Sequence, residues 1–444
     1  MSRTSAPRAS LPARLLARVA EVEPDEAPAV VTAFLLFFCV MGGYFAVRPV
    51  RETVGTILGA ERTADLWTFT WIASVAIVPL YGALCSRFSR TAFLPWIYGF
   101  IALALVTVGV VLRVGQGSVA ASQFFYVFIS VLNLFVISVF WSFLLELFNA
   151  GQTKRLFGVI AAGGTAGALS GPILTDIFVR VVGNAGILFL GAGLFLVAIV
   201  CQRALIRIGA RRSWAAEGTR EMGRPLGGNP FAGFTLVLRS PYLLGIALFV
   251  VFISAASTFL YFQQLRIVAA TFEDPAQRTI VFSRIDYTVQ SLTILLQVAF
   301  TGRLATRFGV GVLLTAVPVV MIAGFLFLAT SGSFAVLAAV MIVRRVGEYA
   351  FVRPGREMLY SAVDTETKYK AKNVIDVPVY RGSDALVAQV DKALAALTLP
   401  AGSVALVGAG VAAAWAVNGF VLGKASRARE AAEPEPEPAP APTV

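Results

Sequence analysis

The sequence predicts an all-α membrane protein with twelve transmembrane helices in two six-helix, pseudo-symmetric halves. Three observations support this fold class. The chain of 444 residues is 57% apolar and only 14% charged, and its mean hydropathy is +0.78. Apolar runs recur along it at about 20 residues each, the length that crosses about 30 Å of hydrocarbon as a helix. Short motifs of the first half also return, in the same order, in the second half.

The repeated motifs indicate a duplicated six-helix unit. Gly82–Phe88 (GALCSRF) returns as Gly302–Phe308 (GRLATRF). Two looser echoes are Tyr44-Phe45 before Arg48 against Tyr261-Phe262 before Arg266, and Glu146 with Lys154-Arg155 against Glu357 with Lys368 and Lys370. Duplicated units of this kind are used by secondary transporters to enclose a central site.

The apolar runs divide the chain into five segments. We expect a cytoplasmic N-terminal segment (1–27), a six-helix half (28–206), a basic linker (207–240), a second six-helix half (241–423) and a disordered tail (424–444). The expected spans are 28–47, 66–84, 92–112, 123–148, 157–178, 185–206, 242–262, 280–300, 310–330, 334–352, 374–397 and 401–422. The eleventh span contains six charged or amide residues, so it must be shielded by protein or border water.

Charge placement predicts the orientation of the chain. Lys and Arg gather on one set of connections, which includes both termini, so both termini are expected to be cytoplasmic. The Arg- and Ala-rich start resembles a transit peptide, but the pattern of Leu11–Ala20 also predicts a short amphipathic helix on the membrane surface, and we favour this second interpretation. The Glu-Pro run at Glu433–Pro440 is too polar to fold.

Several chemistries are disfavoured by composition. The chain has no histidine, and its three cysteines are widely spaced, so we expect no metal site, no cofactor and no enzymatic activity. The net charge of +12 lies at span ends, which argues against nucleic acid as a partner. Gly163, Gly167 and Gly171 are spaced for close helix packing, while a phosphate loop would require a following lysine and a preceding strand.

Three charges are predicted near the middle of the bilayer. Phe334–Val343 precede Arg344, Arg345 and Glu348 without a charge, a rise of about 15 Å. Arg344 and Glu348 share a helix face and are placed to pair. A charge at this depth costs about 3 kcal/mol on insertion scales. Two interpretations stand: a structural ion pair with one snorkelling arginine, or a cationic site for an anionic solute.

Further polar residues border the same expected cavity. Pro49 is expected to disturb the first helix, which would turn Arg48 and Arg51 toward the outer mouth of the cavity, unless they snorkel to the interface. Asn133 either binds solute or bonds a neighbouring helix. The candidate solute-binding residues are Arg48, Arg51, Asn133, Gln263, Gln264, Arg266, Arg344, Arg345 and Glu348.

A second set of charges lies at the cytoplasmic ends of the helices. It is either a group of salt bridges that closes the cytoplasmic side or ordinary loop charge. The candidate gating residues are Glu146, Lys154, Arg155, Glu357, Lys368, Lys370, Lys372 and Asp376.

Several motifs resemble the ATP:ADP antiporter (non-mitochondrial nucleotide transporter) family across residues 30–422. They are RPVRE at Arg48–Glu52, FWSF at Phe140–Phe143, KRLFG at Lys154–Gly158, REMLY at Arg356–Tyr360 and TKYKAK at Thr367–Lys372 with Ile375–Val377 and Arg381. The resemblance implies a major facilitator-like fold. Residues 128–131 lack the family's acid and Arg356 stands where the family has lysine, which places the chain on a bacterial side branch.

We therefore expect a secondary active transporter or exchanger of an anionic, phosphorylated metabolite that works by alternating access, with ATP and ADP as the leading solutes. The expected partners are the lipid bilayer and the solute, and the chain is expected to be a monomer. Two other functions remain open: transport of a different amphipathic solute, or a non-transporting receptor or assembly role on a transporter fold.

Overall fold

The structure, a computed structural model, describes residues 22–23, 25–87, 90–114, 118–211, 232–301, 307, 309–397, 399–400 and 402–430, and these are helical with no strand among them. The helices are α2 (Ala27–Leu58), α3 (Ala60–Arg87), α4 (Arg90–Val114), α5 (Val119–Leu147), α6 (Ala150–Arg211), α7 (Ala232–Arg239), α8 (Pro241–Thr271), α9 (Pro275–Leu296), α11 (Val310–Ser331), α12 (Phe334–Gly347), α13 (Arg353–Leu359), α14 (Thr365–Val374), α15 (Tyr380–Ala396) and α16 (Ser403–Glu430), joined in places by π-helical turns η2 (Gln297–Thr301), η3 (Glu348–Val352) and η5 (Ile375–Val379) and by a short 3-10 turn η4 (Tyr360–Ala362). The expected surface helix, most of the linker, most of the GRLATRF motif and most of the tail lie outside the described residues.

Among the described residues, seven helices are long and apolar enough to cross a membrane: α2, α4, α5, α6, α8, α11 and α16. The 62 residues of α6 form two helical segments that meet across a kink at Gly183, and each segment is long enough to cross about 30 Å of hydrocarbon. Helix α6 changes direction at Gly183, whose positive φ of 69° is one that glycine adopts without a steric penalty. Helices α3, α9, α12 and α15 overlap the remaining expected spans but fall short of the length or hydropathy of these seven.

Large apolar side chains are exposed on many of these helices. Trp96, Leu103, Val200, Leu295 and Phe327 each expose more than half of their surface. A soluble protein rarely leaves so much large apolar surface in water. The exposed surface is therefore suited to lipid, and the chain is a multi-pass membrane protein.

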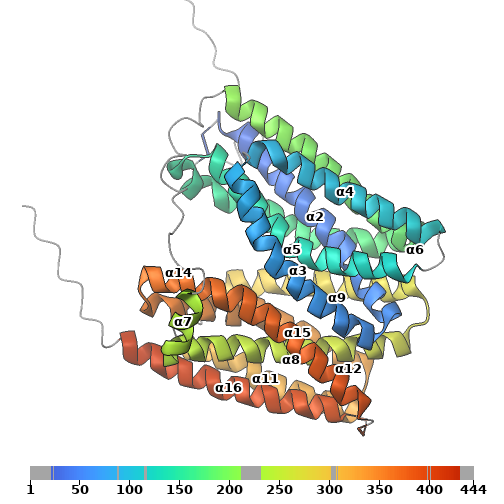
Figure 1. Ribbon diagram of the computed structural model, residues 1–444, viewed down its shortest axis with the longest axis vertical. Coiled ribbons are helices and arrows are strands. Elements are labelled where there is room, and N and C mark those ends of the chain that lie inside the picture. Colours follow the sequence, from blue (N-terminus) through green and yellow to red (C-terminus); the bar gives the residue numbers. More distant parts are fainter. Residues whose placement is uncertain are drawn as a thin grey trace, which may run out of the picture. The chain divides into compact units, whose positions relative to one another are not determined.

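The chain divides into two compact units, each with its own apolar core. Unit 1 comprises residues 1–227 and 268–290, and unit 2 comprises residues 228–267 and 291–444. Helices α2, α4, α5 and α6 pack together in unit 1, and α11 packs on α16 in unit 2 (Figure 1). Residues 268–290, which the sequence analysis assigned to the second half, pack with unit 1.

The spaced glycines of α6 carry its contact with α2. A Cβ atom at Gly163 would lie 2.4 Å from the Phe34 carbonyl oxygen, and one at Gly167 would lie 2.4 Å from the Phe38 carbonyl oxygen. The two backbones are therefore so close that only glycine fits between them. This confirms the helix-packing interpretation of these glycines, and the segment is helical rather than a phosphate loop.

The first helix differs from expectation at its far end. Pro49 was expected to disturb it, but α2 continues without a break to Leu58. A proline removes only one backbone donor, and packing by neighbouring helices holds the rest of the helix in place. Arg48, Arg51 and Glu52 therefore project from a regular helix rather than from a loop.

Candidate functional site

In unit 1, two arginines on α2 surround one buried carboxylate. Glu52 is 5% exposed and forms ion pairs with Arg51 and, at 3.8 Å, with Arg48. Arg51 also donates from Nη1 to Ser130 Oγ at 3.2 Å, and its guanidinium lies 5.5 Å from the centre of the Tyr126 ring. The arginines that the sequence analysis selected are thus held together by an acid of their own helix.

Arg48 has a second carboxylate partner that the sequence analysis missed. Its Nη1 lies 3.4 Å from Oδ1 of Asp286 on α9, which is 3% exposed. The sequence did contain a signal for this contact: Asp286 lies within the eighth expected span. A carboxylate inside the membrane requires a partner, so Asp286 could have been selected as a candidate. The identity of that partner could not be predicted, since α2 and α9 are more than two hundred residues apart.

In unit 2, Arg344 and Glu348 form the ion pair that their spacing predicts. Arg344 Nη1 donates to Glu348 Oε2 at 2.7 Å and to Ser257 Oγ at 2.5 Å, and the hydroxyl comes from α8. The other Glu348 oxygen accepts from Arg353 at 3.0 and 3.1 Å. Glu348 begins the π-helical turn η3, a distortion that is frequent at functional sites. Arg345 is also buried, at 6% exposure.

Among the predicted residues of α8, Arg266 pairs with a different acid. Arg266 pairs in a fork with Asp391 of α15, with Nη1 to Oδ1 at 3.2 Å, and Asp391 is 1% exposed. Gln264 is buried and Gln263 is half-buried. Asn133 lies in α5, and its side chain is outside the described part of the structure.

A buried acid beside this group was not selected from the sequence. Asp384 of α15 accepts a hydrogen bond from Ser254 at 2.6 Å and lies 3.4 Å from Arg381. Asp384 and Ser254 are both buried. Asp384 lies in the eleventh expected span, whose charges were expected to be shielded by protein or to border water. The burial of Asp384 agrees with shielding by protein.

These clusters share one chemical property. Arg48, Arg51, Arg266 and Arg344 each contact a buried carboxylate, so the carboxylates neutralise the guanidinium groups inside the helices. A phosphate presents the same kind of acceptor oxygens to the guanidinium fork as a carboxylate does. The donors that hold these carboxylates are therefore chemically suited to phosphate as well.

At least four of the eight candidate gating residues form ion pairs within their own unit. Arg155 pairs with Glu26 at 3.0 Å and with Glu23 at 3.6 Å, two acids that the sequence analysis did not select. Lys372 pairs with Glu357 at 2.5 Å, while Asp376 pairs with Arg356 at 3.1 Å. Of the other candidates, Lys154 is exposed, and Glu146, Lys368 and Lys370 are half-buried.

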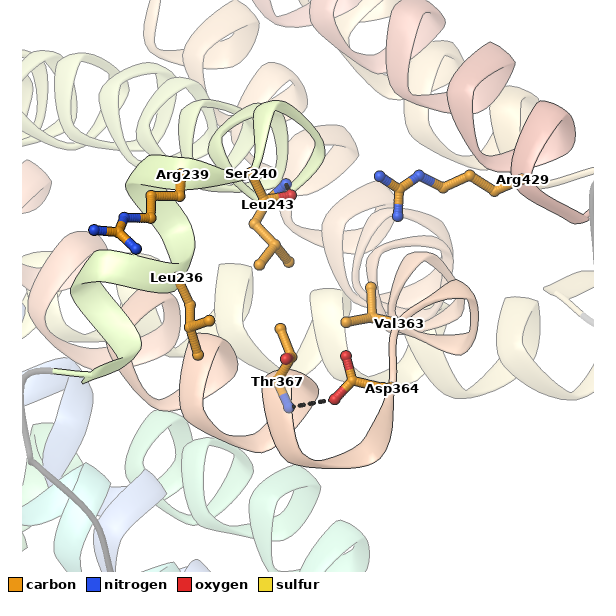
Figure 2. A pocket seen from close by; sticks show the side chains of 8 residues that line it. All are labelled: Leu236, Arg239, Ser240, Leu243, Val363, Asp364, Thr367 and Arg429. Atoms are coloured by element: carbon orange, nitrogen blue, oxygen red, sulfur yellow. Dashed lines mark hydrogen bonds between the residues drawn. The ribbon is translucent and has the colours of Figure 1, made fainter.

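A cavity of about 280 Å³ lies in unit 2 away from these clusters. Figure 2 shows Leu236, Arg239, Ser240, Leu243, Val363, Asp364, Thr367 and Arg429 around it. The Thr367 amide donates to Asp364 at 2.9 Å and lowers the pKa of that carboxyl. None of the membrane-interior arginines lines this cavity, so it is not part of the candidate site. The described residues also hold no group of His, Cys, Asp and Glu that could bind a metal ion.

The Arg266–Asp391 pair gives a testable consequence for stability. We expect Arg266→Gln to lower the thermal melting temperature of the purified protein, because it leaves the deeply buried Asp391 uncompensated at a cost of about 3–5 kcal/mol. Adding Asp391→Asn should restore most of the loss. An Arg266→Gln protein as stable as the parent would contradict a structural contribution from this pair.

Comparison with known proteins places the fold among membrane transporters. No protein-family model matches the chain. ADP,ATP carrier protein 1 of Chlamydia muridarum is 24% identical over 432 residues, covering 81% of this chain and 80% of the relative. The protein of the same name from Chlamydia trachomatis is 23% identical over the same length.

Two solved structures share the fold at low sequence identity. The nucleoside transporter NupG has a TM-score of 0.63 at 15% identity, covering 90% of this chain and 98% of its own. A bacterial homologue of the iron transporter ferroportin, in an inward-facing state, has a TM-score of 0.63 at 14% identity, with the same coverage. The sequence match confirms the predicted resemblance: the chain is a membrane transporter and a distant relative of the ADP,ATP carrier proteins.

Proposed function

We propose that the chain is a secondary active transporter or exchanger of an anionic, phosphorylated metabolite, with nucleotides such as ATP and ADP as the leading candidates. It would work by alternating access in a bacterial inner membrane, with twelve helices in two six-helix halves (28–206 and 241–423) and both termini in the cytoplasm. The names of the two chlamydial relatives support nucleotides as the solute class.

The observation that carries this proposal is the buried cluster around Glu348. Two arginines share this carboxylate, and a hydroxyl from another helix reaches one of them at 2.5 Å. Arg344 and Glu348 are buried, whereas the Arg353 side chain is 52% exposed, so the second arginine presents donors at the accessible edge of the cluster. A phosphate would accept from both guanidinium groups in place of Glu348, because it presents the same kind of acceptor oxygens.

The remaining candidates extend this binding surface. We propose that Arg48, Arg51, Asn133, Gln263, Gln264, Arg266 and Arg345 contribute further donors to the anion. Glu348 would neutralise Arg344 when the site is empty and release it when solute arrives. Glu146, Lys154, Arg155, Glu357, Lys368, Lys370, Lys372 and Asp376 would close the cytoplasmic side through ion pairs, of which Lys372–Glu357 is an example.

Uptake by reconstituted protein tests this proposal directly. Proteoliposomes that contain the full chain and internal ADP should accumulate labelled ATP or ADP faster than protein-free liposomes. Excess unlabelled nucleotide should compete, whereas unphosphorylated adenosine should not, because the arginines recognise phosphate oxygens. If neither ATP, ADP nor any other phosphate ester moves or binds, the proposed function is wrong.

A further inference from the structure

One face of α9 makes a row of polar contacts with the far end of α2 in unit 1. The Thr279 and Thr53 hydroxyls lie 2.7 Å apart and are both fully buried. Thr279 also donates to Asn184 Oδ1 at 2.7 Å. Arg278 donates from Nη1 to Thr56 Oγ1 at 3.1 Å. Three helices, α2, α6 and α9, therefore meet through hydrogen bonds rather than through apolar packing alone.

The same contact region continues along α9 as ion pairs. Asp286 lies two turns beyond Thr279 on nearly the same helix face and pairs with Arg48 at 3.4 Å. Arg284 pairs with Asp176 of α6 at 3.2 Å. Each of these contacts joins a helix of the first half of the sequence to α9, beside Ile280 of α9, which lies in the apolar core of unit 1.

Arg278 also fixes the connection between α8 and α9. Its Nε donates to the Phe272 carbonyl at 2.7 Å, and its Nη2 donates to the Ala269 carbonyl at 3.2 Å. These carbonyls belong to the end of α8, where backbone acceptors lack helical partners. One side chain thus holds the end of α8, the start of α9 and the end of α2 together.

We propose that this face of α9 is the outer gate of the transporter, and that an anionic solute opens it by taking Arg48 from Asp286. The inference rests on the proposed function, which puts the N-terminus of α2 in the cytoplasm and the contacts near Leu58 on the outer side. It adds a gate opposite the cytoplasmic charges and names a residue, Asp286, that couples the gate to the solute.

Electrostatics give the coupling its direction. In the structure, Arg48 lies between two carboxylates, Glu52 and Asp286. A phosphate that binds Arg48 competes with Asp286 for the same donors and also repels it as a like charge. Asp286 then loses its ion pair with Arg48 while remaining buried beside the added negative charge, which is costly, so separation of α9 from α2 becomes favourable. Without solute, Asp286 holds the gate closed.

Linkage makes the coupling reciprocal. If solute binding opens the gate, then weakening the gate must strengthen solute binding by the same factor. Asp286→Asn should therefore open the gate and also tighten the binding of ADP. A residue that serves only to hold the fold together would not improve affinity when it is removed, so the two readouts separate a gate from a structural pair.

Cysteine accessibility measures the gate without requiring transport. Ser283 is fully buried one turn beyond Thr279, so Ser283→Cys in a chain whose native cysteines are replaced by serine reports opening. A membrane-impermeant maleimide is added to intact cells, with and without external ADP. The exposed Gln277→Cys reports the reactivity of the reagent, and the exposed Glu273→Gln is the matched acid-to-amide control.

We expect slow labelling of Ser283→Cys in the parent and faster labelling when ADP is added. Asp286→Asn should label about tenfold faster without ADP, equivalent to about 1.4 kcal/mol, and ADP should add little. Its ADP Kd should fall by a similar factor. Thr279→Val removes a hydroxyl at constant shape and should also raise the labelling rate without ADP. It replaces Asp286→Asn as the test variant if Asp286→Asn does not fold.

If neither Asp286→Asn nor Thr279→Val changes the labelling rate of Ser283→Cys, this face of α9 is not a gate. If ADP leaves the labelling rate of Ser283→Cys in the parent unchanged, the proposed coupling between solute and gate is wrong. If purified protein binds neither ADP nor ATP, the proposed function fails, while the labelling without solute still decides whether α9 is a gate.

Discussion

Replacing Arg344 by alanine is expected to reduce nucleotide transport by at least about a hundredfold, which corresponds to about 2.7 kcal/mol. Arg344 is 9% exposed and offers a guanidinium that already contacts Glu348 and Ser257. A charge-assisted hydrogen bond contributes about 1.5–3 kcal/mol, and a buried phosphate would lose more than one such bond. The measurement is the initial rate of labelled ADP uptake into proteoliposomes, normalised to inserted protein.

Two variants identify the property of Arg344 that matters. Arg344→Lys keeps the charge but loses the planar fork, so we expect an intermediate rate and weaker discrimination among phosphate esters. Arg113→Ala removes an exposed arginine from the last turn of α4 and should transport normally. A fully active Arg344→Ala protein would remove this residue from the site.

A double variant separates the two interpretations that the sequence left open. If Arg344 and Glu348 were only a structural pair, neutralising both with Arg344→Gln/Glu348→Gln should preserve transport, because neither residue keeps a charge and Arg353, which loses Glu348, has a side chain that is 52% exposed. If Arg344 binds the solute, the double variant should be folded and inactive. Size-exclusion elution in detergent establishes the folded state, and uptake then decides between the interpretations.

The predictable parts of the site are those that depend on local spacing. Arg344 and Glu348 are four residues apart, so a helix brings them together whatever surrounds it, and they pair as expected. Asp286, the second acid that pairs with Arg48, and Asp391, which pairs with Arg266, come from other helices. Hydropathy indicates that arginines inside the membrane need partners, but it gives no information on which helices contact one another. Asp286 was therefore missed.

The same distinction holds for the fold. Apolar runs predicted the long helices because burial in lipid depends on the composition of one segment. The far end of α2 was not predicted, because whether a helix continues beyond Pro49 depends on the helices that pack around it. By contrast, the break between the fifth and sixth expected spans (157–178 and 185–206) was predicted, because α6 consists of two helical segments that meet across a kink at Gly183, between those spans.

Helix contact through glycine was predictable, since the spacing itself carries the information. Gly163, Gly167 and Gly171 recur every four residues and therefore line one face of α6. A Cβ atom at Gly167 would meet the Phe38 carbonyl oxygen at 2.4 Å and the Gly42 nitrogen at 2.8 Å, and both belong to the backbone of α2. Neither atom can rotate away as a side chain could.

Substitution of Gly167 by leucine should therefore prevent α2 and α6 from packing and abolish most folded protein. Overpacking of a rigid contact costs about 1–3 kcal/mol or more for added methylenes alone, and here the helix backbones themselves must separate. We expect loss of the monodisperse peak in fluorescence-detected size-exclusion chromatography, with the protein still synthesised. Gly158→Leu makes the same change on an exposed face of α6, where no atom lies within 4 Å of the added Cβ, and it should elute like the parent. Because both variants raise helix propensity equally, a difference between them isolates the contact, whereas equal and normal elution would mean that α2 and α6 do not approach as closely as described.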